Sequence, residues 1–312
     1  MNQIERIVIF SGGVGGAKLV EGFATISPAL HITVIGNVGD DIEQHGLWVS
    51  PDLDIVTYTL ANWVDREKGW GIAGDTFETL RQLKKFGIDT WMNLGDRDLA
   101  THIVRTQLRR EGKRPTEIAR LIAAQAGVCV DIIPPTDDYL QTQVDVDGGT
   151  VSFQEYYVRL RCEPEPLRVH YAGAADARAT PEALEAIKTA DLILIAPSNP
   201  LASIGPILAV SDIRTALAQA SAKRCAVSPL IGGKTLKGPA DRMLKNAGFR
   251  ADPAGIADYY QGLIDHLWVD KIDCDFADSV LKRGICPRMT STVMNDAEDR
   301  RRLAQQILDD GR

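Results

Sequence analysis

A strand-like run, a glycine-rich turn and a helical pattern follow one another near the start of the chain. Ile7–Phe10 is apolar and β-rich, and the positions from Ala17 to Ala24 carry apolar residues at helical spacing. The segment Ser11–Lys18 between them holds four glycines and ends in a lysine. Glycines let a backbone approach a phosphate closely, and the amides of a new helix favour negative charge. This order predicts an α/β fold with an anion-binding site at its first turn.

The residues of this turn limit which nucleotide-binding class it fits. A Walker A motif needs a Ser or Thr after its lysine, whereas Leu19 follows Lys18 here. The dinucleotide pattern needs a glycine where Lys18 stands, which argues against a pyridine-nucleotide oxidoreductase. A tight turn without a ligand is the alternative interpretation. We expect Gly12, Gly13 and Gly15 to form the cradle and Lys18 to add a charge.

Composition and charge set the broad class of protein. The 312 residues are 45% hydrophobic, which allows a sizeable core. The net charge of −7 argues against non-specific binding to nucleic acid or to an anionic membrane. The first residues lack the order of a signal peptide, and no apolar run approaches the roughly 18–20 residues that span a bilayer. Five cysteines without a Cys-x-x-Cys pair indicate a reduced, cytoplasmic protein.

Short β-rich runs alternate with helical patterns along most of the chain. This alternation predicts a Rossmann-like, mostly parallel sheet with helices on both faces, in a single domain over residues 1–312. The expected strands are 7–10, 32–35, 55–57, 91–94, 128–133, 192–196 and 225–227. We expect the chain to end in a helix over residues 296–308.

One stretch, about residues 105–170, breaks this alternation. It holds a helical pattern over 117–126 and two β-rich runs, 140–146 and 150–158. Asp147-Gly148-Gly149 separates the two runs, which predicts a hairpin. We interpret the stretch as an inserted, smaller subdomain that caps the ligand crevice.

Small or polar residues follow several of the expected strands. The carboxyl ends of parallel strands meet at one edge of the sheet, where ligands bind in open α/β folds. The residues placed there are Ser11, Gly12, Asn37, Gly95, Asp96, Ser198, Asn199 and Ser228. Ser228 also begins a second glycine-rich loop that carries Lys234 and Lys237. Two phosphate-type loops argue for a diphosphate or for two ligands.

Carboxylates gather after the second expected strand. Asp40 and Asp41 follow it directly, and Asp52 and Asp54 come shortly after. Hard oxygen ligands of this kind suit Mg²⁺, which would offset the charge of a diphosphate. Turn and N-cap roles are the alternative for each aspartate taken alone.

Two further segments combine helix-start signals with ionisable groups. Asp75 precedes Glu78 by three positions, which predicts an N-cap with a capping box. A helix beginning near Asp98 would place His102 one turn further on the same face, with Arg97 at the mouth of the crevice. Arginine suits phosphate or carboxylate recognition. We interpret His102 as a surface residue of a capped helix, or as a substrate contact, rather than as a catalytic base.

Together and in this order, these segments resemble the 2-phospho-L-lactate transferase family of deazaflavin coenzyme biosynthesis. The resemblance covers nearly the whole chain, and the set of motifs is specific although each motif alone is common. The matching segments are 12–18, 37–41, 51–54, 70–71, 75–77, 95–98, 100–102, 197–200, 228–229 and 238–240.

The resemblance implies a reaction and its partners. A phosphorylated three-carbon acid, carried as a guanosine diphosphate adduct, would be transferred to the ribityl hydroxyl of 7,8-didemethyl-8-hydroxy-5-deazariboflavin. GMP would be released, and the product would be a precursor of coenzyme F-420. The acid is 2-phospholactate, phosphoenolpyruvate or 3-phosphoglycerate. Such a transfer depends on positioning and charge neutralisation. The family also implies a homodimer as one assembly.

The resemblance further implies roles for single residues. Asp41, Asp52 and Arg97 would be catalytic, with Asp41 and Asp52 as the Mg²⁺ ligands. The guanosine diphosphate would lie against Gly12, Gly13, Gly15, Lys18, Ser198, Asn199 and Ser228. The other expected substrate contacts are Asn37, Asp54, Asp75, Thr76, Asp96 and His102, with Asp75 and Thr76 on the acceptor side beside Arg97.

A protein of another class is the main alternative. Regulatory proteins of the gluconeogenesis-factor type resemble this superfamily in the phosphate loop and bind nucleotide sugars. The segments 75–77 and 95–102 and the set of aspartates favour the transferase. Binding of a UDP-sugar without binding of the deazaflavin would favour the regulator.

Overall fold

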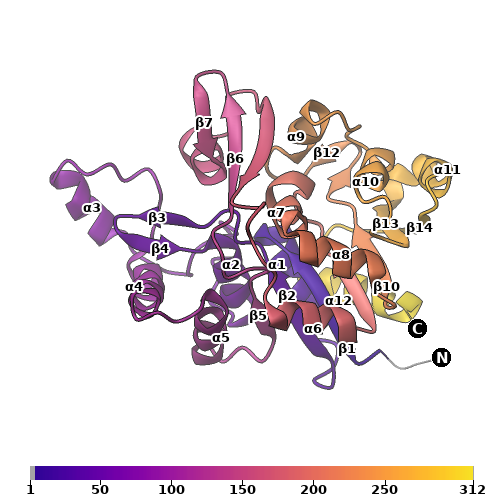
Figure 1. Ribbon diagram of the computed structural model, residues 1–312, viewed down its shortest axis with the longest axis horizontal. Helices are drawn as coiled ribbons and strands as arrows, with labels where there is room; N and C mark the ends of the chain where they lie inside the picture. Colours follow the sequence, from indigo (N-terminus) through magenta and orange to yellow (C-terminus); the bar gives the residue numbers. More distant parts are fainter. Residues whose placement is uncertain (1–3, 312) are drawn as a thin grey trace.

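The computed structural model describes residues 4–311 and is built on a seven-stranded parallel sheet (Figure 1). The strand order is β14-β13-β10-β9-β1-β2-β5. The strands are β1 Arg6–Ser11, β2 His31–Gly36, β5 Asp131–Ile133, β9 Leu192–Ile195, β10 Lys223–Val227, β13 His266–Asp270 and β14 Cys286–Thr290. The chain builds one half of the sheet outward from β1 to β5 and the other half outward from β9 to β14. The direction therefore reverses between β1 and β9, the position at which open α/β sheets bind ligands.

Helices cover both faces of this sheet. On one face α1 packs against α2 and α12, and on the other α6 packs against α8 (Figure 1). The helices are α1 Gly13–Ala24, α2 Pro51–Leu60, α3 Glu78–Lys85, α4 Asp96–Arg110, α5 Pro115–Gln125, α6 Pro181–Thr189, α7 Gly205–Ala209, α8 Ser211–Gln219, α9 Ala240–Asn246, α10 Pro253–Tyr259, α11 Ala277–Leu281 and α12 Ala297–Gly311. The expected α/β class and the helices near 98, 117–126 and 296–308 are confirmed.

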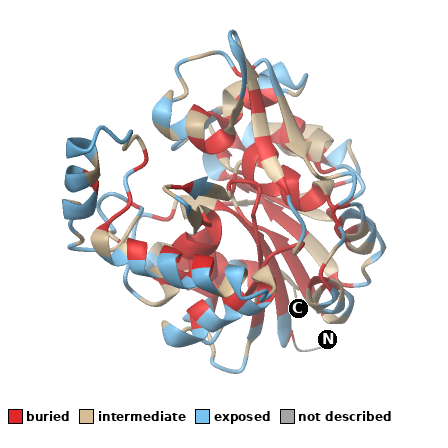
Figure 2. Cartoon of the chain, turned by 60° about the vertical axis from the view of Figure 1, so that its left-hand side comes forward, coloured by how far each residue is buried: buried red, intermediate tan, exposed pale blue. Residues whose placement is uncertain are grey.

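The core lies between the central strands and these helices, as the buried sheet in Figure 2 shows. Strand β9 is the continuous apolar run Leu192–Ile195, and each of its residues is fully buried. In β1, the side chains from Ile7 to Phe10 are buried in the same way. Such runs are typical of parallel strands covered on both faces. The rigid pair β1 and β9 positions the two loops that follow it.

A second, antiparallel sheet stands beside the main one. Its order is β7-β6-β8, with β6 Gln141–Val146, β7 Gly149–Ser152 and β8 Arg168–Ala172. The expected hairpin is therefore present, but its second arm ends at Ser152. Residues from Glu155 to Arg159 form the helical turn η1 instead. Phe153, Tyr156 and Tyr157 have the i, i+3, i+4 spacing of a helix, which explains the change. The subdomain boundaries stay a prediction, since β5 within that range belongs to the main sheet.

Two expected strands are wrong, and two strands of the sheet, β13 and β14, were not expected. Residues 55–57 lie inside α2, where Pro51 in the first turn and two acidic residues near the N-terminus favour a helix. Residues 91–94 form neither strand nor helix, with a bend at Met92, and pair with no strand among the described residues. The expected strand 128–133 begins only at Asp131. Strand β14 was not expected because it is a half-exposed edge strand containing Pro287.

The remaining elements are short and lie near the carboxyl edge or at the periphery. They are β3 Ile42–Gln44, β4 Leu47–Val49, β11 Leu230–Ile231, β12 Lys234–Thr235, η1 Glu155–Arg159, η2 Pro200–Ile204 and η3 Lys271–Phe276. Over residues 4–311, no single helix has the length and apolarity needed to cross a membrane. One pair, Pro200–Ala209 with Ser211–Gln219, meets both criteria jointly but is bent by 91°.

Candidate functional site

A cleft of about 880 Å³ lies where β1 and β9 end. Its walls come from the loops 12–15, 68–71, 92–94, 197–199 and 237–239, from α2 and α4, and from η1 with the residues beside it. The cleft is therefore at the point where the strand order reverses. Elements far apart in the sequence meet there, as the arrangement in Figure 1 allows.

The glycine-rich turn forms one wall and starts α1. Gly13 has a φ of +66°, a conformation that favours glycine. A Cβ atom on Gly15 would lie 2.6 Å from the carbonyl oxygen of Pro197, so this turn packs backbone against backbone on the loop after β9. The first amides of a helix have no acceptor within it. The N-terminus of α1 therefore offers N–H groups and a positive dipole end to the cleft.

Ser198 joins the two loops. Its hydroxyl donates to the Gly12 carbonyl at 2.7 Å and accepts from the Gly12 N–H at 3.2 Å. Asn199 caps the following helical turn by accepting from Leu201 and Ala202. The structure thus brings the expected residues Gly12, Gly13, Gly15, Ser198 and Asn199 together on one side of the cleft.

Asp52 is held against the same turn. The Gly13 N–H donates to one carboxylate oxygen at 2.9 Å, and the Asn37 amide donates to the other at 2.8 Å. Asn37 in turn accepts from the Gly39 N–H at 2.7 Å, which fixes the orientation of its amide. Burial raises the pKa of Asp52 to about 6, although both hydrogen bonds lower it. Asn37 is therefore a positioning residue for Asp52.

Asp40 faces the cleft beside Asp52. Burial raises the pKa of Asp40 well above its usual value, the charge of Asp52 raises it further, and a hydrogen bond from Asn37 lowers it. One oxygen of Asp40 is buried and has no hydrogen-bond partner among the described residues. Two buried carboxyls with raised pKa values and a free oxygen fit a divalent cation, because a cation would stabilise both charges.

Asp41 lies elsewhere than the sequence indicated. One of its oxygens accepts from the Trp48 indole at 3.0 Å and from the Ser50 hydroxyl at 2.8 Å. The side chain is half-buried at the base of the β3–β4 hairpin, its other oxygen is buried without a hydrogen-bond partner among the described residues, and the residue lies outside the set that lines the cleft. Burial raises its pKa to about 7 against the effect of both bonds.

The opposite wall is a network of buried charged and polar groups. The Tyr58 hydroxyl donates to Asp98 at 2.7 Å, and the Nε2 atom of His102 lies 3.3 Å from the same carboxylate. Burial raises the pKa of Asp98, but the bonds from His102 and Tyr58 outweigh it, so the net shift is downward. The Arg105 guanidinium forms a buried ion pair with Asp54.

His102 is 1% exposed, so the expected surface histidine is wrong. Asp54, Asp98 and His102 offer ligand atoms that all lie within 4.8 Å of one another, which makes them a second candidate metal group. The Arg105 guanidinium already neutralises Asp54, whereas the Asp40–Asp52 pair has no ion-pair partner among the described residues. Arg105 was missed by the sequence analysis. Its spacing of seven residues from Asp98 places it on the same helix face and was the available signal.

Asp75 and Asp96 cap helices. Asp75 accepts from the N–H groups of Arg97 and Asp98, at the start of α4. Asp96 accepts from the N–H groups of Glu78 and Thr79, at the start of α3. The expected capping box of Asp75 is wrong, because Phe77 occupies the N-cap position of α3.

Several expected site residues lie apart from the cleft. Thr76 donates its hydroxyl to Asp96, and the Arg97 guanidinium donates to the Ala73 carbonyl at 3.3 Å. Lys18 donates to the Met294 carbonyl at 3.0 Å, and Ser228 bonds Leu230 within its own turn. The residues outside the lining set are Lys18, Asn37, Asp41, Asp75, Thr76, Asp96, Arg97 and Ser228.

Four other cations line the cleft. They are Lys68, Arg161, Lys237 and Arg242. Lys237 comes from the second glycine-rich loop, and its ammonium lies close to Gly69. A phosphorylated ligand on the glycine turn would therefore meet positive side chains from the facing loops.

A parallel α/β fold with a glycine-rich turn and buried carboxylates at its switch point is typical of proteins that handle phosphorylated ligands. The chain belongs to the 2-phospho-L-lactate transferase CofD family, whose sequence model matches residues 7–310. It is therefore a transferase. It is 41% identical to a phosphoenolpyruvate transferase of Streptomyces coelicolor over 97% of both chains. It is 35% identical to a 2-phospho-L-lactate transferase of Methanosarcina mazei, over 97% of this chain and 99% of that one.

A solved structure shares the fold. A protein of the UPF0052 family from Bacillus halodurans superposes with a TM-score of 0.66 over 99% of both chains, at 18% sequence identity. The likeness confirms the Rossmann-like arrangement of the main sheet and its helices.

Proposed function

We propose that this transferase moves a phosphorylated three-carbon acid from a guanosine diphosphate adduct to the ribityl hydroxyl of 7,8-didemethyl-8-hydroxy-5-deazariboflavin. GMP leaves, and the product is a precursor of coenzyme F-420. One observation carries the proposal: a single cleft of about 880 Å³ joins the glycine-rich turn to the carboxyls of Asp40 and Asp52, which have no ion-pair partner among the described residues. A cleft of that size suits two ligands side by side.

The nucleotide half of the donor lies on the glycine turn. Its diphosphate meets the first amides of α1, and Ser198 and Asn199 close the site from the loop after β9. Lys237 and Lys68 balance the phosphate charge from the facing loops.

Mg²⁺ is the proposed cofactor, with Asp52 as one ligand, as the sequence indicated. Asp40 replaces Asp41 as the second ligand, because Asp40 faces the cleft and Asp41 bonds Trp48 and Ser50. Bound Mg²⁺ would offset the charge on the diphosphate. Asn37 keeps Asp52 oriented, so the pair is preorganised before the substrate arrives.

The acceptor lies toward the second wall of the cleft. Trp70, Met92 and Leu94 supply apolar surface for the planar ring system. Tyr58 and Asp98 present a hydroxyl and a carboxylate to the ribityl chain, whose terminal hydroxyl attacks phosphorus. The chain's own residues thus act by orienting the hydroxyl and the diphosphate for in-line attack.

The donor acid is proposed to be phosphoenolpyruvate. Support comes from the higher identity to Streptomyces proteins named phosphoenolpyruvate transferase, at 40–41%, than to archaeal 2-phospho-L-lactate transferases, at 35–36%. 2-Phospholactate and 3-phosphoglycerate are the alternatives.

The test supplies the deazaflavin and Mg²⁺ with each of the three guanosine diphosphate adducts in separate reactions. We expect release of GMP together with a phosphodiester product of the corresponding mass, and fastest turnover with the phosphoenolpyruvate adduct. Faster turnover with another adduct would reassign the acid and leave the transfer intact. No product from any adduct, together with stabilisation by a UDP-sugar, would overturn the proposal in favour of a nucleotide-sugar regulator.

A further inference from the structure

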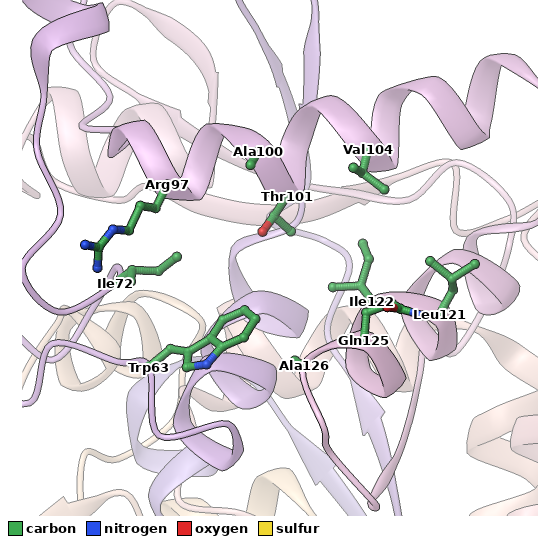
Figure 3. Close-up of a pocket in the computed structure, with 10 residues that line it drawn as sticks. All are labelled: Trp63, Ile72, Arg97, Ala100, Thr101, Val104, Leu121, Ile122, Gln125 and Ala126. Atoms are coloured by element: carbon green, nitrogen blue, oxygen red, sulfur yellow. The ribbon is translucent and has the colours of Figure 1, made fainter.

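A second concavity of about 470 Å³ lies against α4, and its lining residues differ from those of the cleft (Figure 3). It runs between α4, α5 and the loop that carries Trp63. Its lining residues are Trp63, Ile72, Arg97, Ala100, Thr101, Val104, Leu121, Ile122, Gln125 and Ala126. None of these residues lines the cleft. We call this concavity the α4–α5 groove.

The α4–α5 groove is apolar along most of its length. Residues 97, 100, 101 and 104 form one stripe on α4, with the spacing i, i+3, i+4 and i+7. Trp63 is 41% exposed and Val104 is 43% exposed, so large apolar side chains remain open to solvent here. The indole of Trp63 forms the side of the groove opposite Thr101 (Figure 3). Open apolar concavities of this size are typical of small-molecule sites.

A single cation stands at one end of the groove. Arg97 lies at the end away from Leu121 and Gln125 (Figure 3). Its guanidinium donates to the Ala73 carbonyl at 3.3 Å, and no carboxylate of residues 4–311 forms an ion pair with it. An unpaired guanidinium beside an apolar surface complements an anionic group attached to an apolar body.

The walls of the groove are fixed. The backbone N–H of Trp63 donates to the Tyr58 carbonyl at 2.8 Å, and the backbone N–H of Ala73 donates to the Trp63 carbonyl at 2.7 Å. Val64 and Ile72 form a β-bridge that closes the loop. The groove is therefore formed before any ligand arrives, which reduces the entropic cost of binding.

The groove and the cleft share one wall. The Trp63 ring packs on the Tyr58 ring with centroids 6.0 Å apart, and the Tyr58 hydroxyl bonds Asp98 inside the cleft. A ligand against Trp63 would thus lie one aromatic layer from the catalytic cleft.

We propose that the α4–α5 groove is a second ligand site, which binds an amphipathic organic anion: a carboxylate or sulfonate on a planar apolar body. Arg97 binds the anionic group, and Trp63, Val104 and Leu121 hold the apolar body. Occupancy of this site is independent of the transfer reaction, so the proposal stands apart from the assignment of the substrates.

The probe for this site is 8-anilinonaphthalene-1-sulfonate, followed by its fluorescence with saturating GDP present to occupy the nucleotide side of the cleft. We expect saturable binding at one site. Arg97→Gln should weaken it about tenfold, the loss of one charge-assisted contact. Val104→Asp should abolish binding, whereas Ile103→Asp is the matched control, because Ile103 is exposed on the same helix but does not line the groove.

A neutral probe separates charge from shape. N-phenyl-1-naphthylamine should bind the wild type and Arg97→Gln equally well and fail to bind Val104→Asp. Thermal melting checks that each variant is folded. Weaker sulfonate binding with GDP than without it, equal effects of Val104→Asp and Ile103→Asp, or unchanged affinity in Arg97→Gln would each overturn the proposal.

Discussion

Asp75 and Asp96 cap each other's helices. Asp75, which precedes α3, accepts hydrogen bonds from the first amides of α4, at 2.9 Å from the Arg97 nitrogen and 3.1 Å from the Asp98 nitrogen. Asp96, which begins α4, accepts from the first amides of α3 at 2.9 Å. Hydrogen bonds from Thr76 and these amides hold the pKa of Asp96 well below its usual range. This exchange of caps fixes the start of α4, the helix that carries Asp98 and His102 into the cleft.

Replacing Asp75 tests whether it acts as a cap. Asp75→Ala should lower the free energy of unfolding by about 1 kcal/mol, because two amides of α4 lose their acceptor. Asp75→Asn should cost only a few tenths of a kcal/mol, since Asn caps helices nearly as well as Asp. Urea unfolding measures both. If the charge acts on a substrate instead, Asn will abolish transfer as completely as Ala does.

Much of the central sheet could be predicted from the sequence because its strands are short and mostly apolar. The strands containing Ile7, Val34 and Leu194 are uninterrupted β-rich runs between turn signals, and such runs have few other interpretations. Residues 55–57 show the limit of this reasoning. Their β-branched side chains favour a strand locally, but Pro51 and the acidic first turn determine a helix, which buries Val56 completely.

Gly15 is expected to be required for binding of the nucleotide. A Cβ atom there would lie 2.6 Å from the Pro197 carbonyl oxygen, so Gly15→Ala must push the N-terminus of α1 away from the loop after β9. Affinity for GDP should fall roughly tenfold or more, equivalent to about 1.4 kcal/mol. Isothermal titration calorimetry gives the dissociation constant.

Gly112→Ala is the matched control for Gly15→Ala. Gly112 has a φ of +83° and no atom within 4 Å of its Cβ position. The substitution should therefore cost about 1 kcal/mol of stability and leave GDP binding unchanged. An equal loss of GDP affinity in both variants would show that the effect of Gly15→Ala is a general one on stability.

Asp40 and Asp41 are neighbours in sequence but are expected to differ in function. Asp40→Asn removes a carboxylate that faces the cleft, so transfer with Mg²⁺ should fall roughly 100-fold. Asp41→Asn keeps one oxygen to accept from Trp48 and Ser50, and its turnover should stay within about tenfold of wild type. Release of GMP is the assay. A loss with Asp41→Asn as large as that with Asp40→Asn would restore Asp41 as the metal ligand.

The sequence could indicate that carboxylates gather at the cleft, but not which of them face it. Asp40, Asp41, Asp52 and Asp54 all follow or precede turns, and spacing alone does not tell whether a side chain points inward. The decision depends on partners from elsewhere in the chain. Trp48, in the β3–β4 hairpin, donates a hydrogen bond to Asp41. Arg105, which follows Asp54 by 51 residues, neutralises the Asp54 carboxylate.

Asp41 should make the stability of the protein depend on pH. Burial raises its pKa in the folded state to about 7 from the ordinary 3.8, so between these values the folded state binds more protons than the unfolded state. Stability from this group is therefore present below pH 3.8 and is lost as the pH rises through about 7, by up to about 1.4 kcal/mol per pH unit. Asp41→Asn has no titratable group at this position, so its stability lacks this dependence on pH. In melting experiments with EDTA, the melting temperature of the variant should rise relative to that of the wild type as the pH rises from 4 to 7. A constant difference between the two melting temperatures over this range would contradict the expectation.

Arg105 should matter more to stability than an exposed arginine does. It is fully buried with Asp54, so Arg105→Met leaves a buried carboxylate without its cation and should cost about 3 kcal/mol or more. The double variant Arg105→Met with Asp54→Asn removes both charges and should regain most of that loss. Arg66→Met is the control, because the Arg66–Glu21 pair is 42% exposed on the arginine side and should contribute less than about 1 kcal/mol. Urea unfolding compares the four proteins. Equal costs for Arg105→Met and Arg66→Met, or no recovery in the double variant, would show that the Asp54–Arg105 pair is not the source of the stability.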